Sequence, residues 1–201
     1  MNLGANSVTD CGLYFQWAGT QGYTGSQILQ YDRQYLIDYA PYYDAEHDDY
    51  NKYNAYELNT IESLSLVDDA AHTLWGGGWK IPSSIEFQTL INATNRSWET
   101  NYNNSGVNGL LCISKTDSNN VLFFPAGGYY EDDLEYNALL VACWTSDLYH
   151  DCYEHRQALC VLFDDNAEPY DLAGYDYASP CVSISERYCA LNIRPILADT
   201  E

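Results

Sequence analysis

The sequence predicts an α+β fold in a single domain that spans residues 1–201. A chain of 201 residues is long enough for one full core and too short to argue for two domains. Short β-prone runs lie near the start and along the second half, and two segments between them carry helix start and stop signals. Segregation of strands and helices along a chain favours helices packed on a mostly antiparallel sheet.

The first predicted strand is the aromatic run at residues 11–18. A Tyr-rich and Asp-rich insertion follows at residues 23–66. Within it, residues 23–59 show little periodicity, so we expect a long, partly ordered excursion on the surface rather than a second domain.

Two helices are predicted after the insertion. The first covers residues 68–75, with two acids in its first turn and the glycines 76–78 as its stop signal. The second begins after Pro82 and runs to about Asn92, and Ser83 with Glu86 supplies its start signal. Its apolar face is predicted to consist of Ile85, Phe87, Leu90 and Ile91.

Strands are predicted along the remaining chain. Residues 106–113 and 120–125 form a pair joined by the polar turn 114–119. Three further strands are predicted at residues 139–145, 158–163 and 192–197.

Composition excludes several classes of partner. The chain has 8 Lys plus Arg against 29 Asp plus Glu, a formal net charge of −21, which repels nucleic acid and anionic lipid. It contains no run of eighteen apolar residues and no signal-peptide pattern at its start, so we expect neither membrane insertion nor secretion by such a signal.

The cysteines and the tyrosines indicate different features of the protein. The seven cysteines include no C-x-x-C pair, so we expect free and mostly buried thiols. The 20 tyrosines favour a binding surface, because Tyr offers a large amphipathic contact area at low entropic cost. Tyr, His, Asp, Cys and Arg are mixed without a period between the apolar ends of residues 143–163.

Several short motifs in register resemble one protein family. They are the segment DDAAHTLWGGGWKIPSSIEFQTLINATN from residue 68, GVNGLLC from 106, VLFFPAGGY from 121, Trp-Thr-Ser from 144 and Asn-Ile-Arg-Pro-Ile-Leu from 192. Together they resemble the C-type-lectin-like Fibrobacter succinogenes major paralogous domain group, and within it the variable proteins of diversity-generating retroelements. The resemblance runs from about residue 2 to residue 197.

This resemblance implies both a fold and a function. The fold would be that of C-type lectins, in a form that usually needs no calcium or other cofactor. The function would be recognition of a protein or glycan receptor by a hypervariable surface on a virion, phage or cell, without catalysis. A reverse transcriptase system would rewrite adenines near the 3′ end of the gene and would not touch the protein.

The genetic code agrees with diversification of residues 143–197. Adenine mutagenesis of an Asn codon that ends in a pyrimidine yields many residue types, but never Lys, Glu, Gln, Met or Trp. Only Glu154 violates this between residues 147 and 156, and only Glu168 between 164 and 185, although ordinary loops are also compatible with the pattern.

A variable surface requires a backbone held by other side chains. We expect that framework to include Trp144, Leu159, Val161, Phe163 and Ile193. The predicted ligand-binding residues are Asp147, Tyr149, His150, Asp151, Tyr153, His155, Arg156, Asp164, Asp165, Asn166, Tyr170, Asp171, Tyr175, Tyr177, Ser179, Ser183, Ser185 and Tyr188. Residues 131–201 carry fifteen acids and three arginines, so we expect a neutral or basic patch on the ligand.

Two alternatives stay open. Glu168-Pro169 and the pair Trp144 and Asp147 resemble motifs of calcium-dependent sugar lectins, in reversed order. His150 and His155 flank Cys152, but no third group that would orient a catalytic base is evident. Formylglycine-generating enzymes share the broad fold, and Cys181 and Cys189 are the nearest candidates for their paired cysteines.

Overall fold

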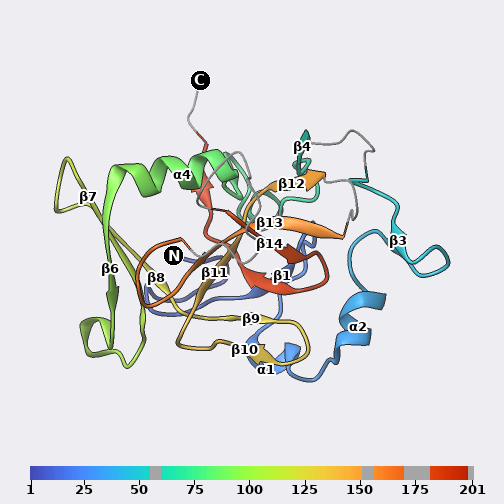
Figure 1. Cartoon of the computed structure of the whole chain (residues 1–201), viewed down its shortest axis with the longest axis horizontal. Coiled ribbons are helices and arrows are strands. Elements are labelled where there is room, and N and C mark those ends of the chain that lie inside the picture. The colour runs from blue at the N-terminus through green and yellow to red at the C-terminus, as the bar shows by residue number, and fades with distance from the viewer. Residues whose placement is uncertain (55–59, 151–155, 170–181, 199–201) are drawn as a thin grey trace.

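The computed structural model describes residues 1–54, 60–150, 156–169 and 182–198. Within them the chain is a mixed α+β protein with many strands and few short helices, as predicted (Figure 1). A curled seven-stranded sheet follows the order β10-β9-β15-β11-β13-β14, with β1 also paired to β15. Its strands are β1 (Tyr14–Gln16), β9 (Tyr129–Tyr130), β10 (Leu134–Glu135), β11 (Val141–Trp144), β13 (Gln157–Phe163), β14 (Ser183–Glu186) and β15 (Ala190–Asn192).

The described residues also form four smaller sheets and several short helices. The helices are α1 (Gly25–Ile28), α2 (Arg33–Asp38), α3 (Ala70–Trp75), α4 (Ser84–Ala93) and the 3₁₀ turn η1 (Tyr102–Asn104). The strand pairs are β2 (Tyr43–Asp44) with β3 (Asp49–Tyr50), β4 (Thr60–Ser63) with β12 (Asp147–His150), and β5 (Trp79–Lys80) with β16 (Ile196–Leu197). A three-stranded sheet contains β6 (Thr94–Glu99), β7 (Gly109–Ser114) and β8 (Val121–Pro125).

The main sheet joins the two halves of the chain. Strand β1 pairs antiparallel with β15, so that Tyr14 lies opposite Asn192. Strand β15 in turn pairs parallel with β11, whereas β11 with β13 and β13 with β14 are antiparallel. Two indole donors brace the same junction: Trp144 Nε1 donates to the Phe15 carbonyl at 2.7 Å, and Trp17 Nε1 donates to the Thr145 carbonyl at 3.0 Å.

Strand β13 is buried on both faces. Cys160 and Leu162 belong to one core cluster, whereas Val161 and Phe163 belong to a second cluster on the opposite face. A continuous apolar run is what a strand covered on both sides requires. All five predicted framework residues are buried: Trp144, Leu159, Val161, Phe163 and Ile193.

Helix α3 confirms the first predicted helix with a later start. Asp69 is its N-cap, with one carboxylate oxygen accepting from the His72 amide at 3.0 Å and the other from the Ile81 amide at 2.8 Å. The helix ends at Gly76, whose φ of 68° suits glycine.

Helix α4 confirms the second predicted helix. Ser83 and Glu86 form the capping box, and Phe87 and Ile91 are buried against the second core cluster. Ile85 was wrongly placed on the apolar face, because it is 70% exposed. At 10 residues α4 is the longest helix of the described ranges, and none of these helices has the length and hydropathy to cross a bilayer.

The strands predicted in the second half of the chain are present with shifted bounds, but β6, β9, β10, β12 and β14 were missed. Strands β7 and β8 form the predicted antiparallel pair, and they are joined by the missed strand β6. Its sequence TNRSWE is polar and is ordered by pairing with β7 rather than by its own pattern. The predicted strand at 192–197 is divided between β15 and β16, because Pro195 has no N–H for a strand ladder.

The prediction of a surface excursion at residues 23–59 is wrong for its described part, residues 23–54. Ile28, Leu36, Tyr50 and Tyr53 are all buried in the first core cluster, together with strand residues of the main sheet. Apolar residues spaced irregularly among tyrosines and acids gave no periodic signal, yet they cover one face of the sheet.

A buried carboxylate fastens this insertion to the start of α3. Asp68 is only 4% exposed. It pairs with Lys52 and accepts hydrogen bonds from Tyr42 Oη, Tyr53 Oη and Ser65 Oγ, the last at 2.8 Å. Burial raises the pKa of Asp68, but the hydrogen bonds from Lys52, Tyr42, Tyr53 and Ser65 outweigh it and lower the pKa to about 2.

We expect the Asp68 carboxylate to make stability depend on acid. Because its folded-state pKa lies below the ordinary value of 3.8, its contribution is complete above about pH 4 and is lost as the pH falls toward 2. Asp68→Asn should therefore lower the free energy of unfolding by about 1 to 2 kcal/mol at pH 7 and by much less near pH 2.5. Urea denaturation at both pH values measures this difference.

The matched control is Glu46→Gln, which removes an exposed carboxylate from the turn between β2 and β3. It should leave the unfolding free energy within about 0.5 kcal/mol of the parent at pH 7. An equal loss in both variants would contradict the anchoring role of Asp68.

Candidate functional site

Ten of the eighteen predicted ligand-binding residues lie in the described part of the chain. Strand β12 contains Tyr149 and His150, paired with Ile61 and Thr60 of β4, and only their backbone is described. Eight predictions fall outside the described residues: Asp151, Tyr153, His155, Tyr170, Asp171, Tyr175, Tyr177 and Ser179.

Asp147 has an architectural position instead of an exposed one. Its side chain accepts from the Ser84 amide at 2.9 Å and Ser84 Oγ at 2.7 Å. Ser63 Oγ donates to the other carboxylate oxygen at 2.8 Å, as does Ser146 Oγ at 3.1 Å. Asp147 is 3% exposed and joins β4, β12 and the first turn of α4, so the prediction of a surface contact is corrected for this residue.

Ser183 and Tyr188 need the same correction. Ser183 lies in β14 opposite Cys160 and is 0% exposed. Tyr188 is 5% exposed, and its hydroxyl donates to Glu131 Oε1 at 3.0 Å. Side chains so enclosed offer a ligand no surface. The sequence did not indicate that these two side chains are buried, because polar and apolar residues are mixed around them without a regular period.

The other described candidates lie nearer the surface. Arg156 forms an ion pair with Asp48 of the insertion at 2.9 Å. Asp164 accepts from the backbone and side-chain nitrogens of Asn166, both at 3.0 Å, which closes the turn after β13. Asp165 and Asn166 are exposed, and Ser185 in β14 is partly exposed.

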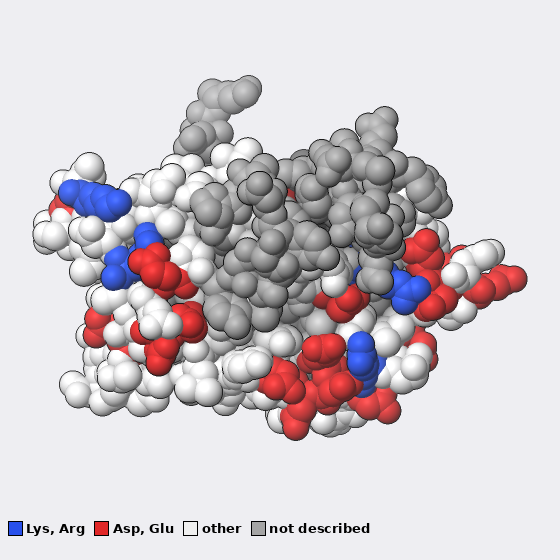
Figure 2. All heavy atoms as spheres, viewed as in Figure 1, with Lys and Arg blue, Asp and Glu red and all other residues white. Residues whose placement is uncertain are grey.

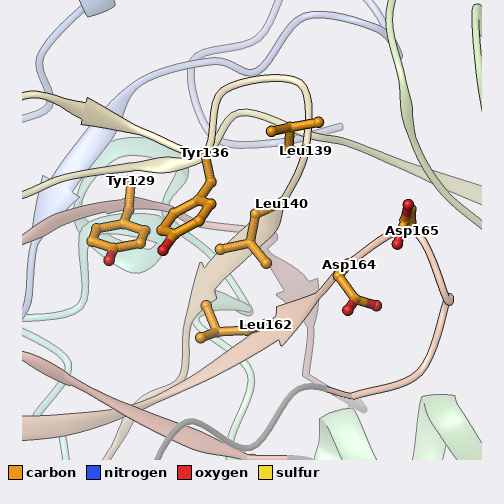
Figure 3. Close-up of a pocket in the computed structure, with 7 residues that line it drawn as sticks. All are labelled: Tyr129, Tyr136, Leu139, Leu140, Leu162, Asp164 and Asp165. Atoms are coloured by element: carbon orange, nitrogen blue, oxygen red, sulfur yellow. The ribbon is translucent and has the colours of Figure 1, made fainter.

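Asp164 and Asp165 border a pocket of about 340 Å³. The two aspartates stand at one end of this pocket and two tyrosine rings at the other, with two leucines between them (Figure 3). We call it the tyrosine–aspartate pocket, and its lining residues are Tyr129, Tyr136, Leu139, Leu140, Leu162, Asp164 and Asp165.

Sequence reasoning missed the tyrosine wall of this pocket. Tyr129 and Tyr136 lie before the segment predicted to vary, on either side of the acidic stretch 131–135. Their signal was available, because YYEDDLEY repeats the mixture of Tyr and acids that marked the candidate binding residues. The structure brings this stretch beside the end of β13.

A second pocket of about 180 Å³ adjoins the first and shares Tyr129 and Leu162 with it. Its lining includes Ser185, Glu131 and Glu186. On the face shown in Figure 2, red acidic atoms outnumber blue basic atoms among the described residues. The described part of that face therefore presents a negative potential to a ligand.

The described cysteines are poorly suited to nucleophilic chemistry. Cys11, Cys112, Cys143, Cys160 and Cys189 are free thiols. Burial raises the pKa of Cys112 to about 11 and of Cys143 to about 12, and it also raises the pKa of Cys189. A reactive cysteine needs the opposite shift. Cys152 and Cys181 lie outside the described residues.

The acidic side chains suggested as calcium ligands already form other contacts. Glu168 accepts from Arg96 at 2.9 Å, and both oxygens of Asp147 accept from serine donors. Among residues 1–54, 60–150, 156–169 and 182–198, no group of three or more His, Cys, Asp or Glu side chains is arranged to hold a metal ion.

We expect Asp147→Ala to destabilise the fold strongly. The substitution removes a carboxylate that accepts four hydrogen bonds in the interior and leaves their donors unpaired. The free energy of unfolding should fall by about 3 kcal/mol. Asp165→Ala, at an exposed position, should change it by less than about 0.5 kcal/mol. Equal losses in chemical denaturation would contradict the distinction.

We also expect the buried thiols to resist alkylation. Iodoacetamide at pH 8 should label Cys112, Cys143, Cys160 and Cys189 slowly in the folded protein, because their thiols are buried and their pKa values are raised. Peptide mass spectrometry would compare native protein with protein unfolded in urea, in which all four should react fully. Rapid labelling of any of the four in the native state would contradict this expectation.

Comparison with known proteins assigns no relative to this chain. No protein-family model matches it, and neither the curated proteins nor the solved structures contain a match. Functional inference therefore depends on the residues and their arrangement.

Proposed function

We propose that this protein recognises ligands through a surface diversified by a retroelement, on a C-type-lectin-like scaffold. The displayed surface would be formed by the C-terminal third, residues 143–197, with the tyrosine–aspartate pocket at one border. Its partner would be a protein or glycan receptor on a target surface, and its setting a virion or a cell surface.

One observation supports the proposal most strongly. The buried side chains that hold the backbone lie on different segments from the side chains that are exposed to solvent. Strands β11 and β13 are buried in two core clusters. In the turn at residues 164–166, which follows β13 directly, Asp165 and Asn166 are exposed and Asp164 is partly exposed, and the side-chain hydrogen bonds described there stay within the turn. Substitutions in such a turn leave the sheet intact, as repeated diversification requires.

The arrangement of helices supports the C-type-lectin-like scaffold. Helix α3 packs through Ala70 and Ala71 into the core cluster on one face of the sheet. Helix α4 packs through Phe87 and Ile91 into the cluster on the other face. This agrees with two helices on a mostly antiparallel sheet, the architecture that the motif resemblance implies.

Charge limits the ligands that this surface can accept. The chain carries a net charge of −21, and acidic atoms outnumber basic atoms among the described residues of the face in Figure 2. A neutral or basic patch on the partner avoids repulsion and speeds encounter. Binding to such a patch weakens as salt is added, because salt screens the attraction.

The gene tests the proposal directly. We expect the DNA downstream of this coding sequence to hold a near-copy of codons 143 to 197 that differs almost only where the copy has adenine. A reverse transcriptase gene should lie nearby. The sequenced locus, aligned codon by codon, measures both expectations and identifies the variable residues.

Differences at random bases, or the absence of a repeat at a fully sequenced locus, would contradict diversification. The internal control is the framework: codons for Trp144, Leu159, Val161 and Phe163 should be identical in the two copies, because their side chains are buried. If the gene shows no diversification, catalysis at Cys152 or Cys181 is the alternative to test.

A further inference from the structure

The tyrosine–aspartate pocket has a shape and chemistry of its own. At about 340 Å³ it lies within the range of small-molecule sites, which begins at about 300 Å³. Five of its seven lining residues are Tyr or Leu, and the other two are Asp164 and Asp165 (Figure 3). An apolar cleft with negative charge at one end selects ligands that have an apolar part and a positively charged group.

The apolar part is open to solvent. The rings of Tyr129 and Tyr136 are stacked with centroids 6.1 Å apart. Tyr136 is 56% exposed and Leu139 is 62% exposed, whereas Leu140 and Leu162 beneath them are buried. Large apolar side chains gathered at an open pocket are a feature of interaction sites.

The backbone around this pocket is held in costly conformations. Tyr136 and Ala138 have φ values of 53° and 62°, in the left-handed region that side chains other than glycine disfavour. Hydrogen bonds keep the segment in place: the Ala138 amide donates to the Ala126 carbonyl at 2.9 Å, and the Gly128 amide donates to the Leu140 carbonyl at 2.9 Å. The tyrosine wall is therefore preorganised.

The charge at the pocket is not neutralised within the described residues. The described partner of the Asp164 carboxylate is neutral Asn166, and in the described part of the chain no basic group forms an ion pair with Asp164 or Asp165. At the opposite end, burial raises the pKa of Tyr129 to about 12, with a smaller contribution from Glu131.

The adjoining pocket differs in this respect. Its Glu131 accepts from the Tyr188 hydroxyl and lies 3.6 Å from Arg33. Its Glu186 accepts from Gln157 Nε2 at 3.0 Å. Since these carboxylates already have partners, the charge available to a ligand lies with Asp164 and Asp165.

We propose that the tyrosine–aspartate pocket binds an organic cation with an apolar stem, in a protein partner the side chain of a lysine or arginine. The stem packs on Leu140 and Leu162 and reaches the tyrosine rings, and Asp164 with Asp165 neutralises the cation at the other end. This assignment rests on the proposed function for the identity of the partner and names the chemistry recognised at one border of the surface.

Leucine-methyl NMR of the full chain tests the pocket with small probes. We expect n-hexylammonium to shift the methyl signals of Leu139, Leu140 and Leu162 saturably, with a dissociation constant in the millimolar range that suits so small a ligand. Hexan-1-ol should bind about ten-fold more weakly, and hexanoate should cause no shift. Comparison with n-hexylguanidinium distinguishes a lysine-like from an arginine-like preference.

Variants separate charge from apolar contact. Asp165→Asn should weaken n-hexylammonium binding about five-fold and leave hexan-1-ol unchanged. Tyr136→Ala should weaken both probes. Glu46→Gln is the charge-matched control, and it should alter neither, because Glu46 lies in the distant turn between β2 and β3 (Figure 1).

Two results would overturn the assignment: no saturable shift of these methyls by n-hexylammonium, or equal affinity for ammonium and alcohol. Both results concern the pocket alone, whereas the codon comparison concerns diversification alone. If the NMR titration shows no binding, the codon comparison still stands. If the codon comparison shows no diversification, the pocket can still bind a cation on a surface that does not vary.

Discussion

Burial of both faces of β13 is the constraint on which the remaining structure depends. Six of its seven residues are buried, so apolar cover must be supplied from two sides. On one side the cover comes from β1, α3 and the Tyr-rich insertion. On the other it comes from α4 with β7 and β8. The insertion is thus a wall of the core, although its composition is that of a surface segment.

Two buried aspartates join segments of these layers to one another. Asp68 joins the insertion to the residues before α3, and Asp147 joins β4 and β12 to α4. Each gathers donors from segments far apart in sequence, so stability is concentrated in the interior. The turn after β13 contributes little to it. That division separates the residues that hold the fold from those that the proposed recognition function would use.

Local signals were sufficient for some elements and not for others. Helices α3 and α4 were predictable because caps and stops are encoded within a few residues, and β7, β8, β11 and β13 because their apolar runs are continuous. Strand β6 and the packing of the insertion depend on partners elsewhere in the chain. For the same reason the burial of Asp147 and Ser183 could not be predicted from neighbouring residues. The composition of residues 129–136 indicated the tyrosine wall, but not that it lies beside Asp165.

The pairing of β1 with β15 links the first strand to nearly the last one. During synthesis, β1 can pair with β15 only after residues 190–192 have left the ribosome, so this sheet closes late. A product truncated by a frameshift or a premature stop lacks β15 and leaves Phe15 and Trp17 without their cover. If the gene is rewritten near its 3′ end, as we propose, such truncated products would fail to fold and would not be displayed.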